Sequence, residues 1–357
     1  MTIIGIDDTD SKTKGMCTTY IGHQIAATLR DAHDATTETY LIRLNPAAKH
    51  KTRGNAAVAI HTTAPQETAF NTAKTLVEKH SHPEVEETNP GVVCIDAAPN
   101  TTTPVTRKLG RFTERALNEF VTISAAEHII ETHDFTSYRV GNGRGKIGAL
   151  AAIGAHTTFT DWTFEGISYR AQRNWGETRC VAWESVKAAH DAFHPRIWDN
   201  YDRVTGEVVC VPHTPCPVLL GVRGDEKPAV ENAVRMITTS EETELVTGCE
   251  VFKSNQGTDV QFSQACIDDV DENKSYELHG VVTKQPETIE GGHVFTELTC
   301  NCSDSDCEAT IDVVAFEPTK RFRDTVRRLR PTDTITIFGE VTDGTVKIEK
   351  FHVNNLK

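Results

Sequence analysis

Short apolar runs alternate with longer amphipathic stretches over the first hundred residues, and this alternation restricts the chain to folds that mix strands with helices. Strands are predicted at 3–6, 38–44, 55–62 and 92–96, and helices at 17–31, 66–80, 103–119 and 124–132. The order of strand, helix, strand, strand, helix and strand indicates an α/β or α+β domain at the start of the chain.

A chain of 357 residues is longer than one hydrophobic core usually supports, so we expect three domains. The composition changes near residue 139, where a glycine-rich turn leads into the small-residue helix of "GNGRGKIGALAAIGA". We therefore assign residues 1–138, 139–272 and 273–357 to separate domains, in an α+β multidomain fold.

The middle segment contains two predicted helices among about four strands, which indicates a ferredoxin-like sandwich. The strands are predicted at 161–171, 207–212, 217–224 and 259–265, and the helices at 186–193 and 227–237.

The last segment is rich in strands and has the element order of an oligonucleotide/oligosaccharide-binding (OB) β-barrel. Strands are predicted at 276–285, 292–300, 307–316 and, as a hairpin, within 334–353, with a helix at 317–329. The "TDGT" sequence at 342–345 is typical of a tight hairpin turn.

The formal net charge of −14 argues against non-specific binding to nucleic acid, which usually needs a positive surface. Evenly spread acidic residues are also typical of halophilic proteins in molar salt. There a Debye length of about 3 Å removes long-range charge effects. The acidity therefore does not exclude an RNA substrate.

The sequence has no run approaching the roughly 18 to 20 apolar residues of a membrane helix, and a strand begins too early for a signal peptide. We expect a cytoplasmic protein without a membrane partner. Ten scattered cysteines indicate buried thiols in a reducing compartment. Cys300, Cys302 and Cys307 lack a fourth ligand and make a poor zinc pattern.

Three aspartates follow the first predicted strand in "IIGIDDTDS". Asp8 and Asp10 are two residues apart, so an extended backbone would direct both carboxylates to one face and Asp7 to the other. Mg²⁺ binds one or two carboxylates together with phosphate oxygens, which suits a nucleotide site, and Thr18 could offer its hydroxyl there. An Asp-rich turn that only caps a helix explains the same pattern equally well.

Two further segments carry basic residues that could bind phosphate. The segment at 42–58 contains Arg43, Lys49, Lys51 and Arg53. This loop either contacts phosphate or is an ordinary solvated turn. "GNGRGKIG" at 141–148 contains Arg144 and Lys146 but is not a Walker A loop, because Ile147 follows the lysine. Its glycines would either form an anion-binding nest or allow close packing.

Polar residues beside the middle strands could bind a cationic amine through carboxylates and a phosphate through an arginine. They are Asp199, Asp202, His213, Arg223, Asn255 and Asp259. In the last segment a predicted basic stripe is either an RNA backbone contact or a solvated helix face. It comprises Lys320, Arg323, Arg327 and Arg330.

Together these segments resemble, in order and over essentially the whole chain, the archaeal tRNA 2-agmatinylcytidine synthetase family. The resemblance rests on "GIDDTDS", "GMCTTY", "LIRLNP", "KTRGN", "TNPG", "GRGKIGALAAIGA", "TPCPVL", "EGGHVF" and "AFEPTK". It implies an N-terminal kinase-like domain, a ferredoxin-like domain and a C-terminal OB domain.

The activity that the resemblance implies is an ATP-dependent ligation of agmatine to C2 of the wobble cytidine in the isoleucine tRNA with a CAU anticodon. The cytosine oxygen would be phosphorylated and then displaced by the agmatine amine, while ATP is consumed to AMP. The partners would be this tRNA and agmatine, with no obligate protein partner.

The resemblance assigns roles to the candidate residues. The catalytic residues would be Asp7, Asp8, Asp10 and the autophosphorylated Thr18, with Mg²⁺ on the three aspartates. ATP would contact Asp8, Lys51, Arg53, Arg144 and Lys146. Agmatine would contact Asp202, Arg223, Asn255 and Asp259, and the tRNA would contact Lys320, Arg323, Arg327 and Arg330.

Family members usually continue into a zinc ribbon, and this sequence stops at Lys357 before one, either because it is truncated or because this member lost the module. The nucleotide chemistry is expected to persist without the ribbon, whereas the binding of tRNA is expected to differ. Two other functions fit the residues. One is a nucleotide-dependent phosphotransferase acting on a small molecule or protein, and the other is a non-catalytic OB-fold RNA-binding protein.

Overall fold

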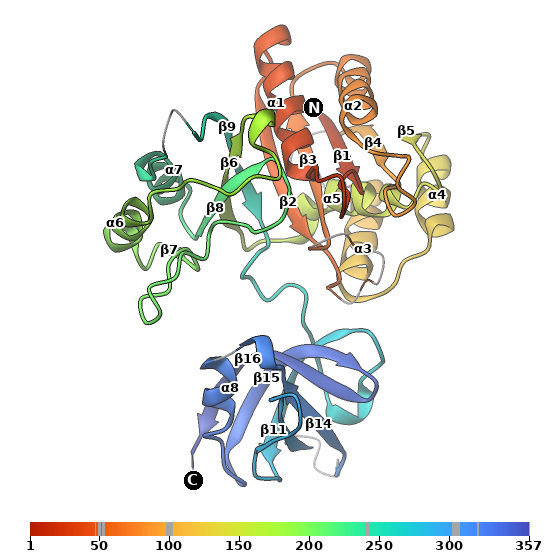
Figure 1. The fold of residues 1–357 in the computed structure, drawn as a ribbon. Coiled ribbons are helices and arrows are strands. Elements are labelled where there is room, and N and C mark those ends of the chain that lie inside the picture. The colour runs from red at the N-terminus through yellow and green to blue at the C-terminus, as the bar shows by residue number, and fades with distance from the viewer. Residues whose placement is uncertain are drawn as a thin grey trace. The chain divides into compact units, whose positions relative to one another are not determined.

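The computed structural model describes residues 1–46, 48, 51, 54–97, 103–239, 243–301, 308–319 and 321–356. The chain divides into two compact units, each drawn in Figure 1. The first comprises Met1–Leu44, Lys49–Ala116 and Val121–Thr258, and the second comprises Asn45–Ala48, Leu117–Phe120 and Asp259–Lys357.

The described part of the first unit contains a sheet of nine strands in the order β5-β4-β1-β3-β2-β9-β6-β8-β7, called here the large sheet. Its strands are β1 (Thr2–Asp7), β2 (Thr37–Arg43), β3 (Ala56–Thr62), β4 (Gly91–Asp96), β5 (Thr136–Arg139), β6 (Thr163–Arg170), β7 (Ile197–Trp198), β8 (Val218–Gly224) and β9 (Val246–Ser254). The helices are α1 (Thr18–His33), α2 (Gln66–His80), α3 (Pro104–Asn118), α4 (Ile123–Thr132), α5 (Gly145–Thr158), α6 (Trp183–Phe193) and α7 (Lys227–Met236).

The large sheet consists of two antiparallel sets of strands that meet at one parallel pair. Strands β5 to β2 form one set and β9 to β7 the other. Between them β2 and β9 run parallel, with Tyr40 opposite Lys253 and Leu41 opposite Ser254. The join between the two sets is therefore short compared with the ladders on either side.

Helices cover both faces of the first set of strands. Ile4 and Ile6 of β1 are fully buried in a cluster with Ile21 of α1 and Val77 of α2. Gly5 points to the other face, where a Cβ atom would lie 2.0 Å from the carbonyl oxygen of Ala149 in α5. Because helices press on both faces, β1 must be apolar on both, which is why it reads as a continuous hydrophobic run.

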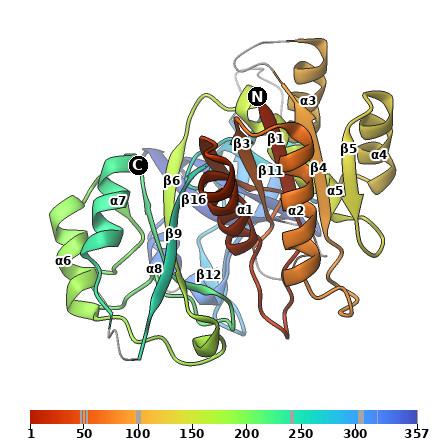
Figure 2. The same ribbon diagram turned by 90° about the horizontal axis from the view of Figure 1, so that it is seen from above.

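The second set of strands is covered by two helices that lie side by side, as Figure 2 shows for α6 and α7. Val230 of α7 packs with Leu220 and Val222 of β8 in a separate hydrophobic cluster. The cluster under the first set also includes Ile167, Tyr169 and Phe252 of β6 and β9, so among the described residues that core extends across both sets, while α6 and α7 pack on a separate one.

Strand directions bring several strand ends to one edge of the large sheet. β1 and β2 are both antiparallel to β3, β9 is parallel to β2, and β8 and β9 are both antiparallel to β6. The carboxyl ends of β1, β2, β8 and β9 therefore share an edge, called here the site edge. β4 and β6 begin at the same edge.

The second unit is a closed barrel in the described residues. Its elements are β10 (Ser263–Ala265), β11 (Ser275–Val282), β12 (Glu287–Thr288), β13 (Val294–Cys300), β14 (Thr310–Ala315), α8 (Arg321–Val326), β15 (Thr334–Thr342) and β16 (Thr345–Asn355). The strands pair in the order β11-β15-β16-β14-β13, and β13 pairs again with β11. The pair β14–β16 is parallel and the others in this ring are antiparallel.

The predicted hairpin turn between the last two strands is confirmed. Asp343 and Gly344 both have positive φ angles, 52° and 71°. Two consecutive residues with positive φ are what a type I′ turn requires, and the Asp-Gly pair adopts them at little cost.

Most of the predicted strands and helices of the first unit are confirmed, but three predictions need correction. The stretch 207–212 is not a strand, because both edges of β8 are already occupied by β6 and β7. Of 259–265, strand structure is confined to β10, which joins the barrel. Strand β9 was not predicted, because Glu250 faces inward and disrupts the expected alternation of apolar and polar residues.

The predicted division at residue 139 stays a prediction. Helix α5 follows that position, yet it packs against β1, β3 and β4, which precede it. The described cysteines are partly as expected: Cys94, Cys210, Cys216 and Cys300 are buried, while Cys180 and Cys249 are exposed. Cys302 and Cys307 lie outside the described residues.

Among the described residues, no helix has the length and apolar character that crossing a membrane requires.

The buried histidine His61 gives the fold a predictable dependence on pH. Its ring lies 4.4 Å from that of Tyr40 and 4.8 Å from that of His156, measured between centroids. Burial lowers the pKa of His61 to about 3, with His156 and Lys253 adding to the effect. The neutral form is therefore favoured in the folded state, so stability is complete above the ordinary histidine pKa and is lost as pH falls below it.

We predict that the free energy of unfolding falls by about 2 kcal/mol from this histidine between pH 8 and pH 5. His61→Phe should remove that part of the pH dependence, measured by urea unfolding at each pH. His33→Gln, at an exposed histidine of α1, is the matched control and should unfold with the wild-type pH slope. An unchanged slope in His61→Phe would contradict the prediction.

Candidate functional site

The loop after β1 leaves the extended conformation at once. β1 ends at Asp7, and Asp8 has a φ angle of 57°, in the left-handed region that aspartate tolerates better than most residues. The expectation that Asp8 and Asp10 lie on one face of an extended strand is therefore wrong. The loop closes instead where the Ser11 N–H donates to the Gly15 carbonyl oxygen at 2.8 Å.

Asp7 points from the end of β1 toward the start of α5. A Cβ atom on Gly148 would lie 2.0 Å from Asp7 Oδ2, and one on Gly145 would lie 2.6 Å from the Asp7 carbonyl oxygen. The glycines of "GRGKIG" thus allow close packing, the second of the two explanations that the sequence left open. Burial raises the pKa of the Asp7 carboxyl well above its ordinary value, and the neighbouring charge of Asp8 raises it further.

Asp8 is held by an arginine from the turn before α5. Arg144 Nε donates to Asp8 Oδ2 at 3.0 Å and a second guanidinium nitrogen lies 2.7 Å from the same oxygen. The Asn89 N–H also donates to this oxygen, at 3.3 Å. Burial raises the pKa of Asp8 to about 7 although Arg144 opposes the shift. Two adjacent carboxyls that resist ionisation form a place where a cation would be stabilised.

Thr18 starts helix α1 beside these aspartates. Thr9 Oγ1 donates to Thr18 Oγ1 at 3.0 Å, and the Thr18 residue is 5% exposed. Cys17 precedes the helix in an extended conformation, and its side chain does not cap the helix end. The start of α1 therefore offers a hydroxyl oriented by hydrogen bonding and the positive end of a helix dipole at the same place.

A segment from the second set of strands closes against this loop. Arg179 donates to the carbonyl oxygens of Val218 at 2.9 Å, Thr214 at 2.8 Å and Cys216 at 3.2 Å. Gly15 has a φ angle of 82°, and a Cβ atom there would lie 2.3 Å from the carbonyl oxygen of Pro215. The "TPCPVL" segment is thus clamped by one guanidinium and touches the backbone of the aspartate loop.

The residues predicted to bind ATP are only partly brought together. Asp8 and Arg144 form an ion pair, whereas Lys146 points to Glu127 of α4, with 3.4 Å between Lys146 Nζ and Glu127 Oε1. Lys51 is half-buried and belongs to the loop after β2. Arg53 lies outside the described residues.

The residues predicted to bind agmatine are divided between the two units. Arg223 and Asn255 lie at the site edge, where Asn255 bonds the backbone of Arg43. Asp202 accepts hydrogen bonds from two backbone N–H groups of its own turn, those of Val204 and Thr205. Asp259 belongs to the second unit and forms an ion pair there with Lys350 at 2.5 Å.

The predicted basic stripe of the last segment does not form as a helical stripe. α8 ends at Val326, so Arg327 and Arg330 follow the helix. Arg323 donates to the Gly292 carbonyl oxygen, and Arg327 is paired with Asp324. Arg330 is exposed. Lys320 lies outside the described residues.

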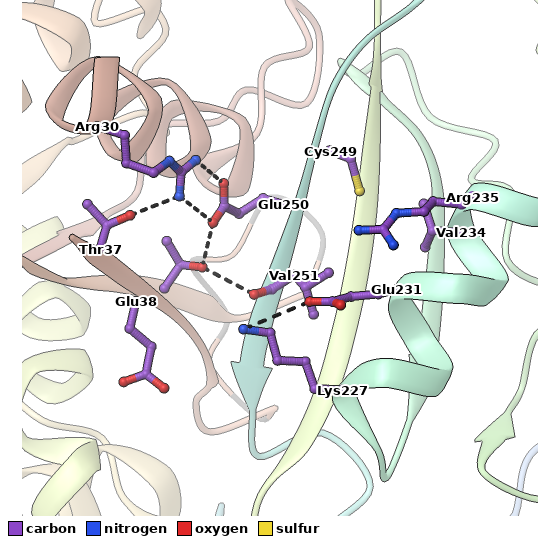
Figure 3. A pocket seen from close by; sticks show the side chains of 11 residues that line it. Arg30, Thr37, Glu38, Lys227, Glu231, Val234, Arg235, Cys249, Glu250 and Val251 are labelled. Atoms are coloured by element: carbon purple, nitrogen blue, oxygen red, sulfur yellow. Dashed lines mark hydrogen bonds and ion pairs between the residues drawn. The ribbon is translucent and has the colours of Figure 1, made fainter. Parts of the chain in front are cut away.

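A separate cavity of about 360 Å³ opens where β2 and β9 diverge (Figure 3). Figure 3 shows Arg30 directed at Glu250, with 2.7 Å between the paired atoms, while Lys227, Glu231 and Arg235 come from α7. The lining is Arg30, Thr37, Glu38, Thr39, Lys227, Glu231, Val234, Arg235, Cys249, Glu250 and Val251. Its acidic and basic side chains balance, and Arg30 is in the last turn of α1, at the opposite end of that helix from Thr18.

Among the residues that the structure describes, no group of three or more His, Cys, Asp or Glu side chains is arranged to hold a metal ion. The oxygen atoms of Asp7 and Asp8 nevertheless suit Mg²⁺, which commonly takes one or two protein carboxylates and completes its shell with phosphate oxygens and water. The donor set therefore fits a magnesium–nucleotide complex better than a metal held by protein alone.

Two family models match the chain. The model described as the TiaS TCKD domain matches residues 3–68, and that described as the TiaS FLD domain matches residues 143–261. The 2-agmatinylcytidine synthetase TiaS of Haloquadratum walsbyi, named for its isoleucine-2 tRNA, is 39% identical over the whole of this chain and 83% of the relative.

The solved structures that resemble the chain over its whole length include two TiaS complexes. The crystal structure of TiaS in complex with isoleucine-2 tRNA and ATP is 33% identical, with a TM-score of 0.88 and 82% of that chain covered. The crystal structure of TiaS in complex with the same tRNA, AMPCPP and agmatine is 32% identical, with a TM-score of 0.87 and 83% covered.

We predict that Gly148→Ala displaces the Asp7 carboxylate, because the added methyl group would lie 2.0 Å from Asp7 Oδ2. Overpacking of this kind should lower the free energy of unfolding by about 1–3 kcal/mol, measured by urea unfolding. Gly110→Ala in α3 is the matched control, since its methyl group would meet only the hydroxyls of Thr157 and Thr158. If Gly148→Ala and Gly110→Ala unfold alike, with Asp7 in place in the crystal structure of Gly148→Ala, the prediction is wrong.

Proposed function

This chain belongs to the tRNA 2-agmatinylcytidine synthetase family, whose members are named for isoleucine-2 tRNA, and from that membership we propose how it acts. It is an ATP-dependent ligase that joins agmatine to C2 of the wobble cytidine in the isoleucine tRNA with a CAU anticodon. Similarity over the whole chain to a complex containing isoleucine-2 tRNA, an ATP analogue and agmatine supports this assignment.

The observation that carries the proposal is the arrangement at the site edge. Asp7 and Asp8 lie half-buried beside each other at the end of β1, inside the segment matched by the TCKD model. Thr18 lies in the same loop region, tied by its hydroxyl to Thr9. Carboxylates, a hydroxyl and a helix start together are what binding and transfer of a phosphoryl group require.

The reaction proceeds in two chemical steps. The cytosine O2 atom first forms a bond to a phosphorus atom of ATP while the P–O bond from that phosphorus to the rest of the nucleotide breaks. Since ATP is consumed to AMP, the remaining phosphate is released as well. The primary amine of agmatine then forms a bond to C2 while the C2–O bond breaks, and the oxygen departs on phosphate. Phosphorylation is needed because an unmodified carbonyl oxygen is a poor leaving group.

The protein's own residues orient the reacting groups. The first turn of α1 directs backbone N–H groups and the Thr18 hydroxyl at phosphate oxygens, and Arg144 fixes the orientation of Asp8. Mg²⁺ bound by Asp7, Asp8 and Asp10 would supply neutralisation of the phosphate charge. The wobble cytidine has to leave its base stack to reach these groups.

We assign the remaining roles as follows. Asp202 is the proposed carboxylate for the agmatine cation, and the second unit binds the tRNA through its exposed arginines, including Arg330. Asn255 is removed from the agmatine set because both groups of its amide already bond to Arg43. Arg323 acts within the barrel rather than on the tRNA.

The finer fold assignment accompanies this function. We propose an N-terminal kinase-like domain, a ferredoxin-like domain and an OB domain. The sheet order β9-β6-β8-β7, with α6 and α7 between the strands, supports the second. The parallel β14–β16 pair within a closed ring of antiparallel strands supports the third. Because α5 packs on β1, we place it with the kinase-like domain.

We predict that Thr18→Ala and Asp8→Asn each lower agmatine incorporation by about 100-fold or more, on the scale of losing a group that acts in the transition state. Thr18→Ser keeps the hydroxyl and should keep measurable activity. The measurement is incorporation of labelled agmatine into the CAU-anticodon transcript in the presence of ATP.

Two controls define the outcome. A transcript with uridine in place of the wobble cytidine should accept no agmatine, and Asp34→Asn, at an exposed aspartate after α1, should behave as wild type. Wild-type turnover by Thr18→Ala and Asp8→Asn would refute the site. Phosphorylation of a small acceptor without tRNA would instead support the phosphotransferase alternative.

A further inference from the structure

Two arginines at the site edge are held in the same unusual way. The Arg43 N–H donates to Asn255 Oδ1 at 2.7 Å, and Asn255 Nδ2 donates to the Arg43 carbonyl oxygen at 3.0 Å. The Arg223 N–H donates to Asn200 Oδ1 at 3.1 Å, and Asn200 Nδ2 donates to the Arg223 carbonyl oxygen at 3.3 Å. In each case one asparagine side chain satisfies both backbone groups of one arginine.

The asparagines replace strand partners that the sheet does not supply. The β2–β9 pairing stops at Leu41 and Ser254, so the backbone of Arg43 lies beyond the end of that ladder. Arg223 is opposite Trp198 in the last pair of the β7–β8 ladder, and Asn200 follows two residues after that pair. Asn200 and Asn255 are 1% and 2% exposed. Buried amides with both groups bonded fix the position of the arginine backbones.

The two guanidinium groups meet at one buried carboxylate. An Arg43 guanidinium nitrogen donates to Glu165 Oε2 at 2.7 Å, and Arg223 Nε lies 3.7 Å from Glu165 Oε1. Burial would raise the pKa of Glu165, but the two arginines outweigh it and hold the pKa below its ordinary value. Glu165 is therefore ionised, and the trio carries a net charge of +1 in an acidic protein.

The single carboxylate of Glu165 does not accept hydrogen bonds from all the N–H donors of the two guanidinium groups. The Nε atoms of Arg43 and Arg223 have no acceptor among the described residues, while the two side chains remain 28% and 33% exposed. A guanidinium has five N–H donors, so the contacts with Glu165 occupy only part of the donors of each arginine. A structural ion pair would need one arginine, whereas two arginines held apart by one carboxylate suit an anion with several oxygens.

The arginine pair lies at the same edge of the large sheet as the proposed catalytic aspartates. β3 separates β1 from β2, so the strand ends that carry Asp7 and Arg43 are about 10 Å apart at ordinary strand spacing. A net positive pair repels cationic agmatine. The chemistry that it suits is phosphate.

We propose that Arg43 and Arg223, positioned by Asn255 and Asn200 and bridged by Glu165, form a phosphate-binding site at the site edge. The assignment deepens the proposed function, on which it rests, and moves Arg223 from the agmatine set to the binding of a phosphate. That phosphate belongs either to ATP or to the tRNA backbone, and the two sources leave different signatures.

The test is equilibrium binding of ATP and of the CAU-anticodon transcript to Arg43→Gln, Arg223→Gln and wild type over a series of salt concentrations. If ATP occupies the pair, its Kd should rise about tenfold or more in both variants while tRNA binding is unchanged, the scale of a lost charge-assisted contact. If tRNA occupies it, tRNA affinity should fall and the slope of log K against log salt should decrease by about one per arginine.

Arg235→Gln is the matched control, because it removes an exposed arginine near the end of α7, away from the site edge. Wild-type affinity of Arg43→Gln and Arg223→Gln for both ligands, equal to that of Arg235→Gln, would overturn the proposal. Binding is measured without turnover, so this result is distinct from a failure of agmatine incorporation by the wild-type protein, which would refute the function itself.

Two conservative variants keep the test decisive if a glutamine variant fails to fold. Arg43→Lys and Arg223→Lys preserve the charge opposite Glu165 but lose the planar fork, so affinity for the relevant ligand should fall about threefold or more. Thermal unfolding reports whether each variant is folded. Folded lysine variants with wild-type affinity for both ATP and tRNA would then overturn the proposal.

Discussion

The large sheet depends on a parallel junction of limited extent between β2 and β9, where the described ladder pairs Tyr40 with Lys253 and Leu41 with Ser254. Polar contacts brace the junction on both sides. Toward the site edge, Asn255 bonds the backbone of Arg43. Away from it, Glu250 accepts hydrogen bonds from Arg30 at 2.7 Å, from Thr39 at 3.0 Å and lies 3.0 Å from His23 Nδ1. These buried side-chain hydrogen bonds connect the two sets of strands where the short β2–β9 ladder has no backbone hydrogen bonds.

The same junction explains why charged side chains from both sets of strands lie at one edge of the large sheet. Because β9 runs parallel to β2, and β8 parallel to β9, the strand ends of both sets face the same way. Asp7 comes from the first set and Arg223 from the second, although more than two hundred residues separate them in sequence. An antiparallel junction would have placed them at opposite edges, and no loop rearrangement could have brought them together.

Much of the fold and the centre of the site could be predicted from the sequence, and the exceptions have physical causes. Asp7, Asp8 and Thr18 lie in one local segment, so a strand followed by a turn and a helix was enough to group them. The sequence places helix α5 in the same domain as the segment that follows it, because the two are adjacent in the chain. The small residues of α5 predict that the helix packs closely, but they do not show which strands it packs against. The roles of Asn200 and Asn255 exist only in the folded chain, where each asparagine bonds an arginine backbone that is distant in sequence. Strand β9 was not predicted for the same reason, because the partners of the inward-facing Glu250 are also distant in sequence.

The contact between Gly15 and Pro215 joins the aspartate loop to the second set of strands without any side chain between them. Side chains usually accommodate small movements by changing rotamer, but two backbone segments in direct contact cannot adjust in this way. A displacement of the aspartate loop is therefore transmitted directly to the segment that Arg179 clamps, and the reverse also holds. The aspartate loop and the segment before β8 are thus mechanically coupled at this backbone contact.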